Sequence, residues 1–288
     1  MTVTDSAATR PRPDLLVDVQ SLAAELAGDR PPIVIDARWT LTGPPGILSY
    51  RAGHLPGARF ADLDTELSGR RGAAGRHPLP TAADFERLMR RLGVNDHSAV
   101  VTYDALDSVP AARAWWDLRY FGHENVRVLD GGYPAWVTAG LPFTLEEPVV
   151  VPGDFVARPG GMPIIDADQA ADVAKNGALI DVRVGERYRG EVEPVDPIAG
   201  RIPGAVNLPS AGNVGPDGKF LDIETLRKRY EELGLAVGAE VGVYCGSGVN
   251  AANAVFAMTL AGLETPALFV GSWSHWIADP TRPIATGR

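Results

Sequence analysis

A single cysteine lies in the stretch Val241-Gly242-Val243-Tyr244-Cys245-Gly246-Ser247-Gly248-Val249-Asn250-Ala251. Apolar residues alternate with Gly242 before the cysteine, which predicts a short buried strand. The small and apolar residues 250–258 that follow predict a helix. Cys245 is therefore expected at the turn that joins a strand to a helix.

This turn contains two glycines, Gly246 and Gly248. Because they lack a Cβ, the backbone can curl and point successive N–H groups at one spot beside the positive end of the helix. A thiolate at that spot is stabilised, so we expect a depressed pKa for Cys245 and a nucleophilic sulfur. The other interpretation of a lone cysteine is a small buried hydrophobic residue. The Gly-Ser-Gly turn at a strand end favours the nucleophile.

The composition is that of a soluble globular protein, with 45% hydrophobic and 22% charged residues. A formal net charge of -9 argues against a nucleic acid or an anionic membrane as partner. One cysteine excludes an intramolecular disulfide and a multi-cysteine zinc site, and the five histidines are scattered, so neither a metal nor another cofactor is expected. No apolar run long enough to span a membrane occurs, and residues 1–14 lack the apolar core of a signal peptide. The sequence predicts a cytoplasmic protein.

The second half of the sequence repeats the first. Each half has an apolar strand ending in Asp-x-Arg, a Gly-x-x-Pro-Gly-Ala motif, a helix, a strand ending in tyrosine, and a segment with tryptophan, in the same order. The matched pairs are 34–38 and 179–183, 53–58 and 200–205, 82–92 and 223–233, 100–103 and 241–244, and 129–136 and 268–276. This order indicates a tandem duplication.

Strands alternate with helices in both copies, so the sequence predicts the α/β class, with two tandem domains that are each a mainly parallel sheet flanked by helices. We expect an N-terminal domain at 15–142, a linker with several prolines and glycines at 143–162, and a C-terminal domain at 163–286. Ligands of such folds bind at the carboxyl ends of strands, which is where Cys245 is expected.

The two copies differ at the residue after the tyrosine. Tyr103 is followed by Asp104, whereas Tyr244 is followed by Cys245. Because a carboxylate is a poor replacement for a thiolate in sulfur chemistry, we expect the N-terminal domain to be non-catalytic and to wall the pocket of the other domain. Asp104 is expected either to bind a nearby donor such as Arg113 or to be a solvated loop residue.

Together these motifs resemble the tandem-domain rhodanese superfamily, which comprises thiosulfate and 3-mercaptopyruvate sulfurtransferases. The resemblance covers nearly the whole chain and includes the Gly-Ser-Trp-Ser-x-Trp ending at 271–276. It implies that Cys245 takes a sulfane sulfur from a small-molecule donor, holds it as a persulfide, and passes it to cyanide, a thiol or thioredoxin. It also implies that the following loop cradles the persulfide, through Gly246, Gly248, Val249 and Asn250.

The loop sequence Cys-Gly-Ser-Gly-Val resembles the 3-mercaptopyruvate type, whereas thiosulfate-preferring members carry basic residues after the cysteine. Thiosulfate is a dianion, and no lysine or arginine stands between Cys245 and Ala251 to attract it. Ser247 is then expected to donate to the carbonyl of the donor, or else to be a turn residue that bonds its own backbone. Thiosulfate stays the alternative donor.

Anion binding is therefore expected from arginines outside the loop. The resemblance assigns the donor carboxylate to Arg187, because a guanidinium fork suits a carboxylate, and Arg183 is a further candidate. The competing interpretation of Arg187 is a surface ion pair with Glu186 or Glu191. A second arginine that family members have downstream is missing here, since residues 194–197 read Pro-Val-Asp-Pro.

His54 matches the histidine of the family's His-x-Pro-Gly-Ala motif. The resemblance implies that this histidine positions Ser247 and moves protons. No acidic partner for it is found in the preceding stretch 44–53. The competing interpretation is therefore that the ring of His54 simply holds its turn.

Two other functions compete with sulfur transfer. A cysteine-dependent phosphatase uses a similar cradle but needs an arginine shortly after the cysteine, where this chain has Asn250, Ala251 and Ala252. A non-catalytic binding module usually loses its cysteine, as the N-terminal copy has, whereas the C-terminal copy keeps Cys245. Sulfur transfer is the predicted function.

Overall fold

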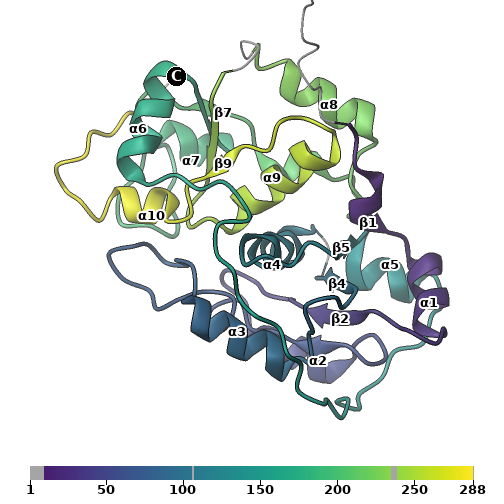
Figure 1. Cartoon of the computed structure of the whole chain (residues 1–288). Coiled ribbons are helices and arrows are strands. Elements are labelled where there is room, and N and C mark those ends of the chain that lie inside the picture. Colours follow the sequence, from purple (N-terminus) through teal and green to yellow (C-terminus); the bar gives the residue numbers. More distant parts are fainter. Residues whose placement is uncertain (1–9, 106, 235–238, 288) are drawn as a thin grey trace, which may run out of the picture.

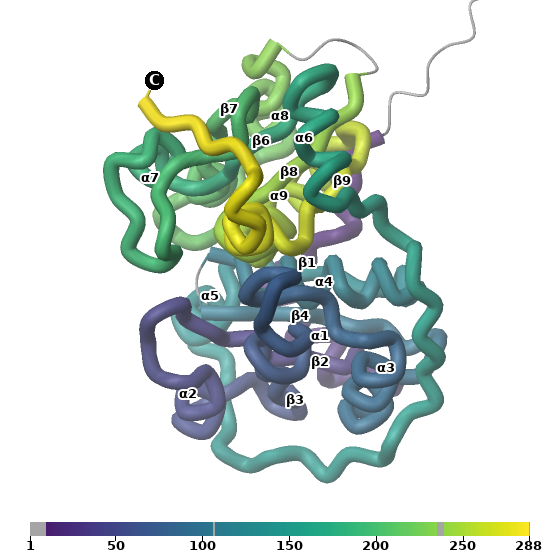
Figure 2. The backbone as a smooth tube through the Cα atoms, turned by 90° about the vertical axis from the view of Figure 1, so that its left-hand side faces the viewer, coloured from purple at the N-terminus to yellow at the C-terminus, as the bar shows by residue number. Residues whose placement is uncertain are grey.

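The computed structural model describes residues 10–105, 107–234 and 239–287. They form two α/β domains of similar architecture, which lie one above the other in Figure 1 and again in the side view of Figure 2. The predicted α/β class with two tandem domains is confirmed.

The N-terminal domain is built on a five-stranded parallel sheet. Its strands are, in spatial order, β1 (Leu16–Val17), β5 (Val126–Leu129), β4 (Val100–Tyr103), β2 (Ile33–Asp36) and β3 (Arg59–Phe60). The central strand β4 is buried along its whole length, as expected for a parallel sheet that is covered on both faces. The helices are η1 (Pro13–Leu15), α1 (Val19–Leu26), α2 (Gly46–Ala52), α3 (Ala82–Arg91), α4 (Val109–Tyr120) and α5 (Gly132–Thr138).

The C-terminal domain has a four-stranded parallel sheet. Its strands are, in spatial order, β7 (Val206–Asn207), β6 (Ala178–Asp181), β8 (Val241–Tyr244) and β9 (Ala267–Leu268). The helices are α6 (Ala167–Asn176), α7 (Gly185–Arg189), η2 (Ser210–Asn213), α8 (Ile223–Glu231), α9 (Val249–Leu260) and α10 (Ser272–Trp276). The strand β8 and the helix α9 stand where the cysteine stretch predicts them.

Side-chain caps begin the equivalent helices α3 and α8. Thr81 accepts the backbone N–H of Asp84, and Asp222 accepts that of Thr225. Each cap satisfies a backbone N–H that has no partner within its helix.

The repeated Asp-x-Arg motifs have the same structural role in both domains. Arg38 pairs with Asp36 at 2.6 Å and donates to the carbonyl of Gly53 at 2.7 Å. In the second domain Arg183 pairs with Asp181 at 2.6 Å and donates to the carbonyl of Gly200 at 2.7 Å. These contacts tie the Gly-x-x-Pro-Gly-Ala turn to the end of the neighbouring strand, so short strands are held in place.

The two domains pack through α4 and α9, which lie side by side between the sheets (Figure 1). Trp115 of α4 meets Phe256 of α9 edge to face, with ring centroids 4.8 Å apart. Both rings are fully buried in a hydrophobic cluster that includes residues of both domains. Because an apolar helix of each domain is covered by the other, the first domain forms a fixed wall for the second.

Residues 139–166, between α5 and α6, contain no helix, and in Figure 2 this segment runs around the outside of the first domain. Its Thr144 forms an antiparallel bridge with His54. In the described part of the chain, no helix is both long and apolar enough to cross a membrane.

Candidate active site

Cys245 lies at the turn between β8 and α9 and is 2% exposed. The backbone N–H of Gly248 donates to its Sγ at 3.1 Å. Gly248 has φ +83°, and a Cβ at this position would clash with the carbonyl oxygen of Val270. Only glycine therefore fits this turn without displacing the backbone behind it. The left-handed conformation of Gly248 directs its own N–H group at the sulfur.

Residues of the short helix α10 form hydrogen bonds with the backbone of the cysteine loop. Ser272 accepts the N–H of Cys245 at 3.1 Å, while Trp273 and Ser274 donate their N–H groups to the carbonyls of Cys245 and Gly246. These bonds involve the backbone of the loop, so they fix its shape whatever side chains it carries. The Gly-Ser-Trp-Ser-x-Trp ending thus acts as a support for the cysteine loop.

Ser247 is joined to a histidine that the sequence interpretation missed. The Oγ atom of Ser247 lies 2.7 Å from Nδ1 of His77, and Nε2 of His77 lies 2.9 Å from Asp64. Burial lowers the pKa of His77, although the hydrogen bond that His77 donates to Asp64 raises it, so the ring is neutral near pH 7. Because a carboxylate only accepts, Nε2 carries the proton and Nδ1 accepts the hydroxyl of Ser247.

The sequence feature that could have indicated His77 is a difference in length between the two copies of the repeat. Between the Pro-Gly-Ala motif and the cap of the next helix, the first copy has residues 59–80 and the second only 206–221. The extra residues in the first copy form the loop that brings His77 to the other domain. No local periodicity marks such a contact, since Ser247 lies 170 positions further along the chain.

His54 does not reach this site, and its predicted role beside Ser247 is wrong. Its side chain is fully buried, with Nδ1 2.8 Å from the carbonyl of Tyr50 and Nε2 3.2 Å from that of Glu146. The ring also stacks on Tyr50 with centroids 3.8 Å apart. His54 therefore holds the turn against the segment that leaves the first domain, which is the competing interpretation given above.

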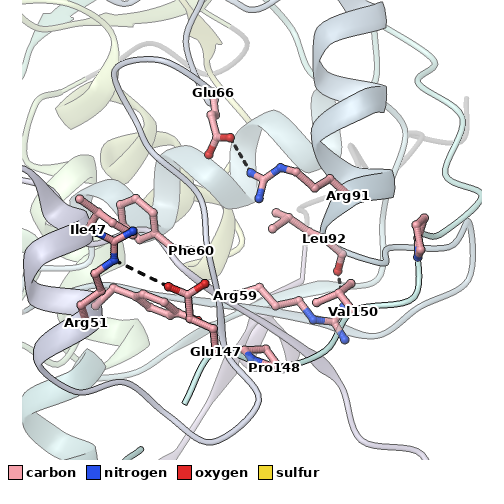
Figure 3. A pocket seen from close by; sticks show the side chains of 12 residues that line it. Ile47, Arg51, Arg59, Phe60, Glu66, Arg91, Leu92, Glu147, Pro148 and Val150 are labelled. Atoms are coloured by element: carbon pink, nitrogen blue, oxygen red, sulfur yellow. Dashed lines mark hydrogen bonds and ion pairs between the residues drawn. The ribbon is translucent and has the colours of Figure 1, made fainter. Parts of the chain in front are cut away.

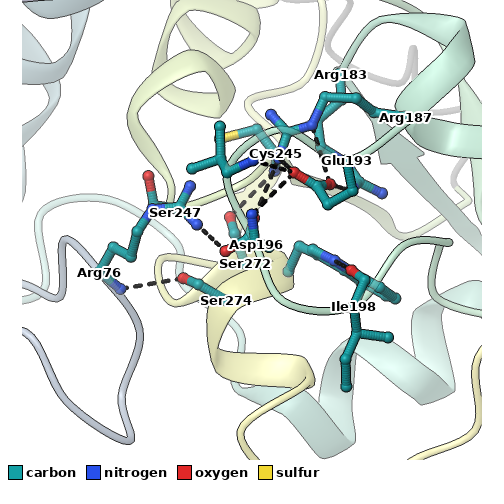
Figure 4. Close-up of polar contacts among 12 residues, drawn as sticks. Arg76, Arg183, Arg187, Glu193, Asp196, Ile198, Cys245, Ser247, Ser272 and Ser274 are labelled. Atoms are coloured by element: carbon teal, nitrogen blue, oxygen red, sulfur yellow. Dashed lines mark hydrogen bonds and ion pairs between the residues drawn. The ribbon is translucent and has the colours of Figure 1, made fainter. Parts of the chain in front are cut away.

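Arg187 lies beside the loop but pairs with other carboxylates than the two expected. It donates to Glu193 at 2.6 Å and to Asp196 at 3.1 Å. Its side chain is 14% exposed, so this is a nearly buried ion-pair cluster, not a surface pair. Figure 4 shows Arg187 and Glu193 above Asp196, close to Cys245.

Arg183 is fixed by the strand-end contacts described above. Its guanidinium also stacks over the ring of Trp273 at 4.9 Å, and Asp181 raises its pKa, so it stays charged. Since Arg38 makes the same contacts in the domain without cysteine, the primary role of Arg183 is structural. It lines the cavity as a fixed charge.

The cavity in front of Cys245 has a volume of about 180 Å³. The loop residues Gly246, Ser247, Val249 and Asn250 line it, as do the arginines of both domains, Arg76, Arg183 and Arg187. Val249 is buried, whereas Asn250 is exposed at the rim. The structure thus places these four loop residues around one cavity with Arg183 and Arg187, adds Arg76 from the first domain, and leaves Gly248 behind the sulfur as its N–H donor.

A larger cavity of about 500 Å³ lies on the first domain, away from Cys245 (Figure 3). Two ion pairs cross it, Arg51 with Glu147 and Arg91 with Glu66. Its charged groups therefore largely neutralise one another, and the described residues that line it include no cysteine, serine or histidine. The cavity at Cys245 is the better candidate for chemistry.

The corresponding loop of the first domain is closed on itself. The carboxylate of Asp104 accepts the backbone N–H groups of Ser108 and Ala111, at 3.2 and 3.1 Å. Arg113, the donor suggested for Asp104, instead forms a fully buried pair with Asp117 at 2.9 Å. Asp104 is itself buried, so it is not a solvated loop residue.

The family model of the rhodanese-like domain matches residues 18–139 and again 166–279. A "Probable 3-mercaptopyruvate sulfurtransferase" of Pseudomonas aeruginosa is 45% identical over 280 residues, which are 94% of this chain and 98% of the relative. A "Putative thiosulfate sulfurtransferase SseB" of Mycobacterium tuberculosis is 43% identical over 284 residues, 96% of this chain and 98% of the relative.

Among solved structures, SseA from Escherichia coli, which is described with the 3-mercaptopyruvate sulfotransferases, aligns with a TM-score of 0.80 and 28% identity. The alignment covers 90% of this chain and 99% of SseA. The family match, the relatives and the fold agree. The chain belongs to the rhodanese family and is a tandem-domain sulfurtransferase of the 3-mercaptopyruvate or thiosulfate type.

Proposed function

We propose that the protein transfers sulfur from 3-mercaptopyruvate to a thiophilic acceptor through a persulfide on Cys245. The observation that supports this donor is the chain of hydrogen bonds from Ser247 to His77 and Asp64, which ends beside the cysteine. A donor that leaves as an enolate needs a proton, whereas thiosulfate leaves as sulfite and needs none. A proton relay at this place is therefore best explained by a carbonyl-containing donor.

In the proposed reaction the Cys245 thiolate attacks the sulfur of mercaptopyruvate and forms an S–S bond. The C–S bond breaks, and its electron pair leaves with the three-carbon fragment as the enolate of pyruvate. The thiol proton of the donor passes through Ser247 to Nδ1 of His77 and returns to the enolate carbon, which gives pyruvate. Asp64 stabilises the charged ring in between. The products are one pyruvate and one Cys245 persulfide anion.

The persulfide then loses its outer sulfur to the acceptor. A cyanide ion attacks that sulfur, leaves as thiocyanate and restores the thiolate; a small thiol or a thioredoxin-like protein reacts in the same way and becomes a persulfide. The N–H of Gly248 is placed to stabilise Sγ of Cys245 as the thiolate, which attacks the donor and is restored when the acceptor takes the outer sulfur. Because the intermediate is covalent, ping-pong kinetics are expected.

The test compares pyruvate release from mercaptopyruvate with thiocyanate formation from thiosulfate, with cyanide as the common acceptor and Cys245→Ser as blank. We expect the larger kcat/KM for mercaptopyruvate. Ser247→Ala and His77→Gln are expected to lower kcat with mercaptopyruvate by about 10²- to 10⁴-fold, the usual contribution of general acid–base catalysis, and to change kcat with thiosulfate much less.

A clear preference for thiosulfate, with equal losses for both donors in Ser247→Ala, would contradict the proposal. Thiosulfate is the second candidate because two guanidinium groups, those of Arg76 and Arg187, lie against Gly246, and such a pair suits a dianion. The variant kinetics separate the two candidates, since only the first needs the relay.

A further inference from the structure

Three arginines and three carboxylates form one chain of ion pairs along the wall of the Cys245 cavity. Each guanidinium stands between carboxylates or at the end of the chain, so the six charges cancel. In spatial order the members are Asp181, Arg183, Glu193, Arg187, Asp196 and Arg76. Charges that alternate in this way hold each other in place, but they leave little net attraction for an anionic donor.

Arg76 enters this chain from the other domain. It precedes His77 in the first-domain loop, and its backbone N–H donates to Ser274 of α10 at 3.1 Å. Its side chain is 9% exposed and pairs with Asp196, whose side chain is 3% exposed. Figure 4 shows Arg76 and Arg187 approaching from opposite sides of the cysteine loop. The loop that supplies the histidine therefore also supplies a buried positive charge.

Both guanidiniums lie close to the space that a side chain would occupy at Gly246, the residue that follows the nucleophile. A Cβ built on Gly246 would lie 2.7 Å from Nη2 of Arg76 and 3.5 and 3.6 Å from Nη2 and Nη1 of Arg187. Gly246 thus leaves room for two positive groups where any larger residue would meet them. In addition, Nε of Arg76 is buried without a hydrogen-bond partner among the described residues. The ion pair with Asp196 therefore leaves one donor of Arg76 without a partner among the described residues.

Asp196 shows what kind of ligand fits between the two arginines. Its carboxylate accepts from Arg187 through one oxygen and from Arg76 through the other. It lies on the segment 190–200, which has neither helix nor strand. A carboxylate held between two guanidiniums is the arrangement that a donor carboxylate would have in the same place.

We propose that Arg76 and Arg187 form a two-arginine site for the carboxylate of the donor, and that Asp196 is an internal carboxylate that competes for this site and sets its affinity. This inference rests on the proposed function for the identity of the anion. Arg76 supplies, from the first domain, a positive charge that residues 194–197 do not carry. Residues 194–197 instead contribute the negative charge of Asp196. The affinity of the site for an anion therefore depends on the positive charge of Arg76 and on the competing negative charge of Asp196.

Binding is measured first without turnover, by calorimetry on Cys245→Ser protein with pyruvate and with thiosulfate. Arg76→Met is expected to weaken pyruvate binding about tenfold, since it removes one charge-assisted contact, and Arg76→Lys is expected to keep part of the affinity. Asp196→Asn is expected to tighten binding about three- to tenfold, and more for the dianion than for pyruvate, because it removes the competing charge.

The matched control is Glu191→Gln, because Glu191 is an exposed carboxylate that pairs with Arg189 and is not part of the chain of ion pairs. This variant should bind both anions like the parent. In the enzyme with Cys245 intact, the same substitutions at 76 and 196 should move KM in the same directions and leave kcat within about twofold, as for interactions made equally in ground and transition states.

Unchanged pyruvate binding in Arg76→Met would overturn the two-arginine site. Weaker binding in Asp196→Asn would overturn the competition, since Asp196 would then be an anchor that positions the arginines. Thermal unfolding of each variant checks that the fold is kept, and Arg76→Lys retains the charge if Arg76→Met unfolds. If thiosulfate proves the better donor, the proposed function fails, whereas binding of both anions still reports on Arg76 and Asp196.

Discussion

The loop after β4 and the loop after β8 occupy equivalent places in the two domains, yet they hold different residues and make different contacts. In the first, the carboxylate of Asp104 accepts two N–H groups at the start of α4. In the second, the sulfur of Cys245 accepts one N–H, from Gly248, and faces a cavity. In the first loop the carboxylate of Asp104 occupies the backbone N–H groups, so the loop is closed. In the second loop the residue at this place is a cysteine, and the cavity in front of it leaves room for an anionic ligand.

The helices behind these loops show that each domain also serves the other. Arg113 and Asn253 are both the fifth residue of their helices, α4 and α9. Asn253 donates to the carbonyls of Asp107 and Ser108 in the opposite loop. Arg113 donates to the carbonyl of His77, and its Nη1 would be 3.2 Å from a Cβ at Gly248. The domain without cysteine thus contacts both the histidine and the cysteine loop.

The largest effect on sulfur transfer is expected when the cysteine is removed from the second loop and introduced into the first. Cys245→Ser should abolish sulfur transfer, and adding Asp104→Cys should not restore it, because the side chain at 104 points at the backbone N–H groups of Ser108 and Ala111, whereas the arginine-lined cavity lies in front of residue 245. The measurement is thiocyanate formation, together with intact-mass detection of one added sulfur after incubation with donor. Asp104→Asn alone is the control and should retain transfer. A persulfide on the introduced cysteine of the double variant would show that the first loop is open.

The second effect concerns the buried pair of Arg113 and Asp117, in the domain that lacks the cysteine. Arg113→Met leaves the carboxylate of Asp117 buried and uncompensated, so the free energy of unfolding should fall by about 3–5 kcal/mol. Adding Asp117→Leu should recover most of the loss, because both charges are then gone. Urea unfolding measures both. A loss below about 1 kcal/mol in Arg113→Met would mean that solvent reaches the pair.

The third effect is on the pH dependence of the reactive loop. Protonated His77 cannot accept the hydroxyl of Ser247, and burial lowers the pKa of this ring below the ordinary value of 6.5. Protonation of His77 should therefore lower the kcat/KM for mercaptopyruvate only below pH 6.5. Asp64→Asn removes a contact that raises this pKa, so the decrease should move to still lower pH. An acid limb below pH 6.5 that does not move in Asp64→Asn would contradict this assignment.

The sequence predicted the repeated elements and the exchange of Asp104 for Cys245, and it missed the side chains that reach from one domain into the other. The strands, the paired motifs and the cysteine loop were predictable because each depends on a local pattern or on its second copy. His77 and Arg76 were not predictable, since they act in the domain to which they do not belong. His54 was misassigned because its motif is repeated: its counterpart Arg201 also contacts the segment that ends its domain, through the carbonyl of Gly287. A repeated motif indicates shared structure, whereas chemistry depends on where the copies diverge.

The smallest effect is on stability, and it concerns the residues that precede α4 and α9, Ser108 and Gly248. Both residues are in the left-handed region, but Gly248 suits it and Ser108, at φ +55°, does not. The hydroxyl of Ser108 is also buried with no partner among the residues that the structure describes. Ser108→Gly should therefore raise the free energy of unfolding by about 1 kcal/mol, the relief of backbone strain and of the unsatisfied hydroxyl exceeding the added entropy of the unfolded chain.

The control for this substitution is Ser49→Gly, at an exposed position inside α2, where the same change should lower stability by about 0.5–1 kcal/mol. Sulfur transfer should be unaffected by Ser108→Gly, because the first loop takes no part in it. If Ser108→Gly destabilises the protein as much as Ser49→Gly, its hydroxyl must be bound in solution. The closed loop would then depend on a contact beyond those of Asp104 and Asn253.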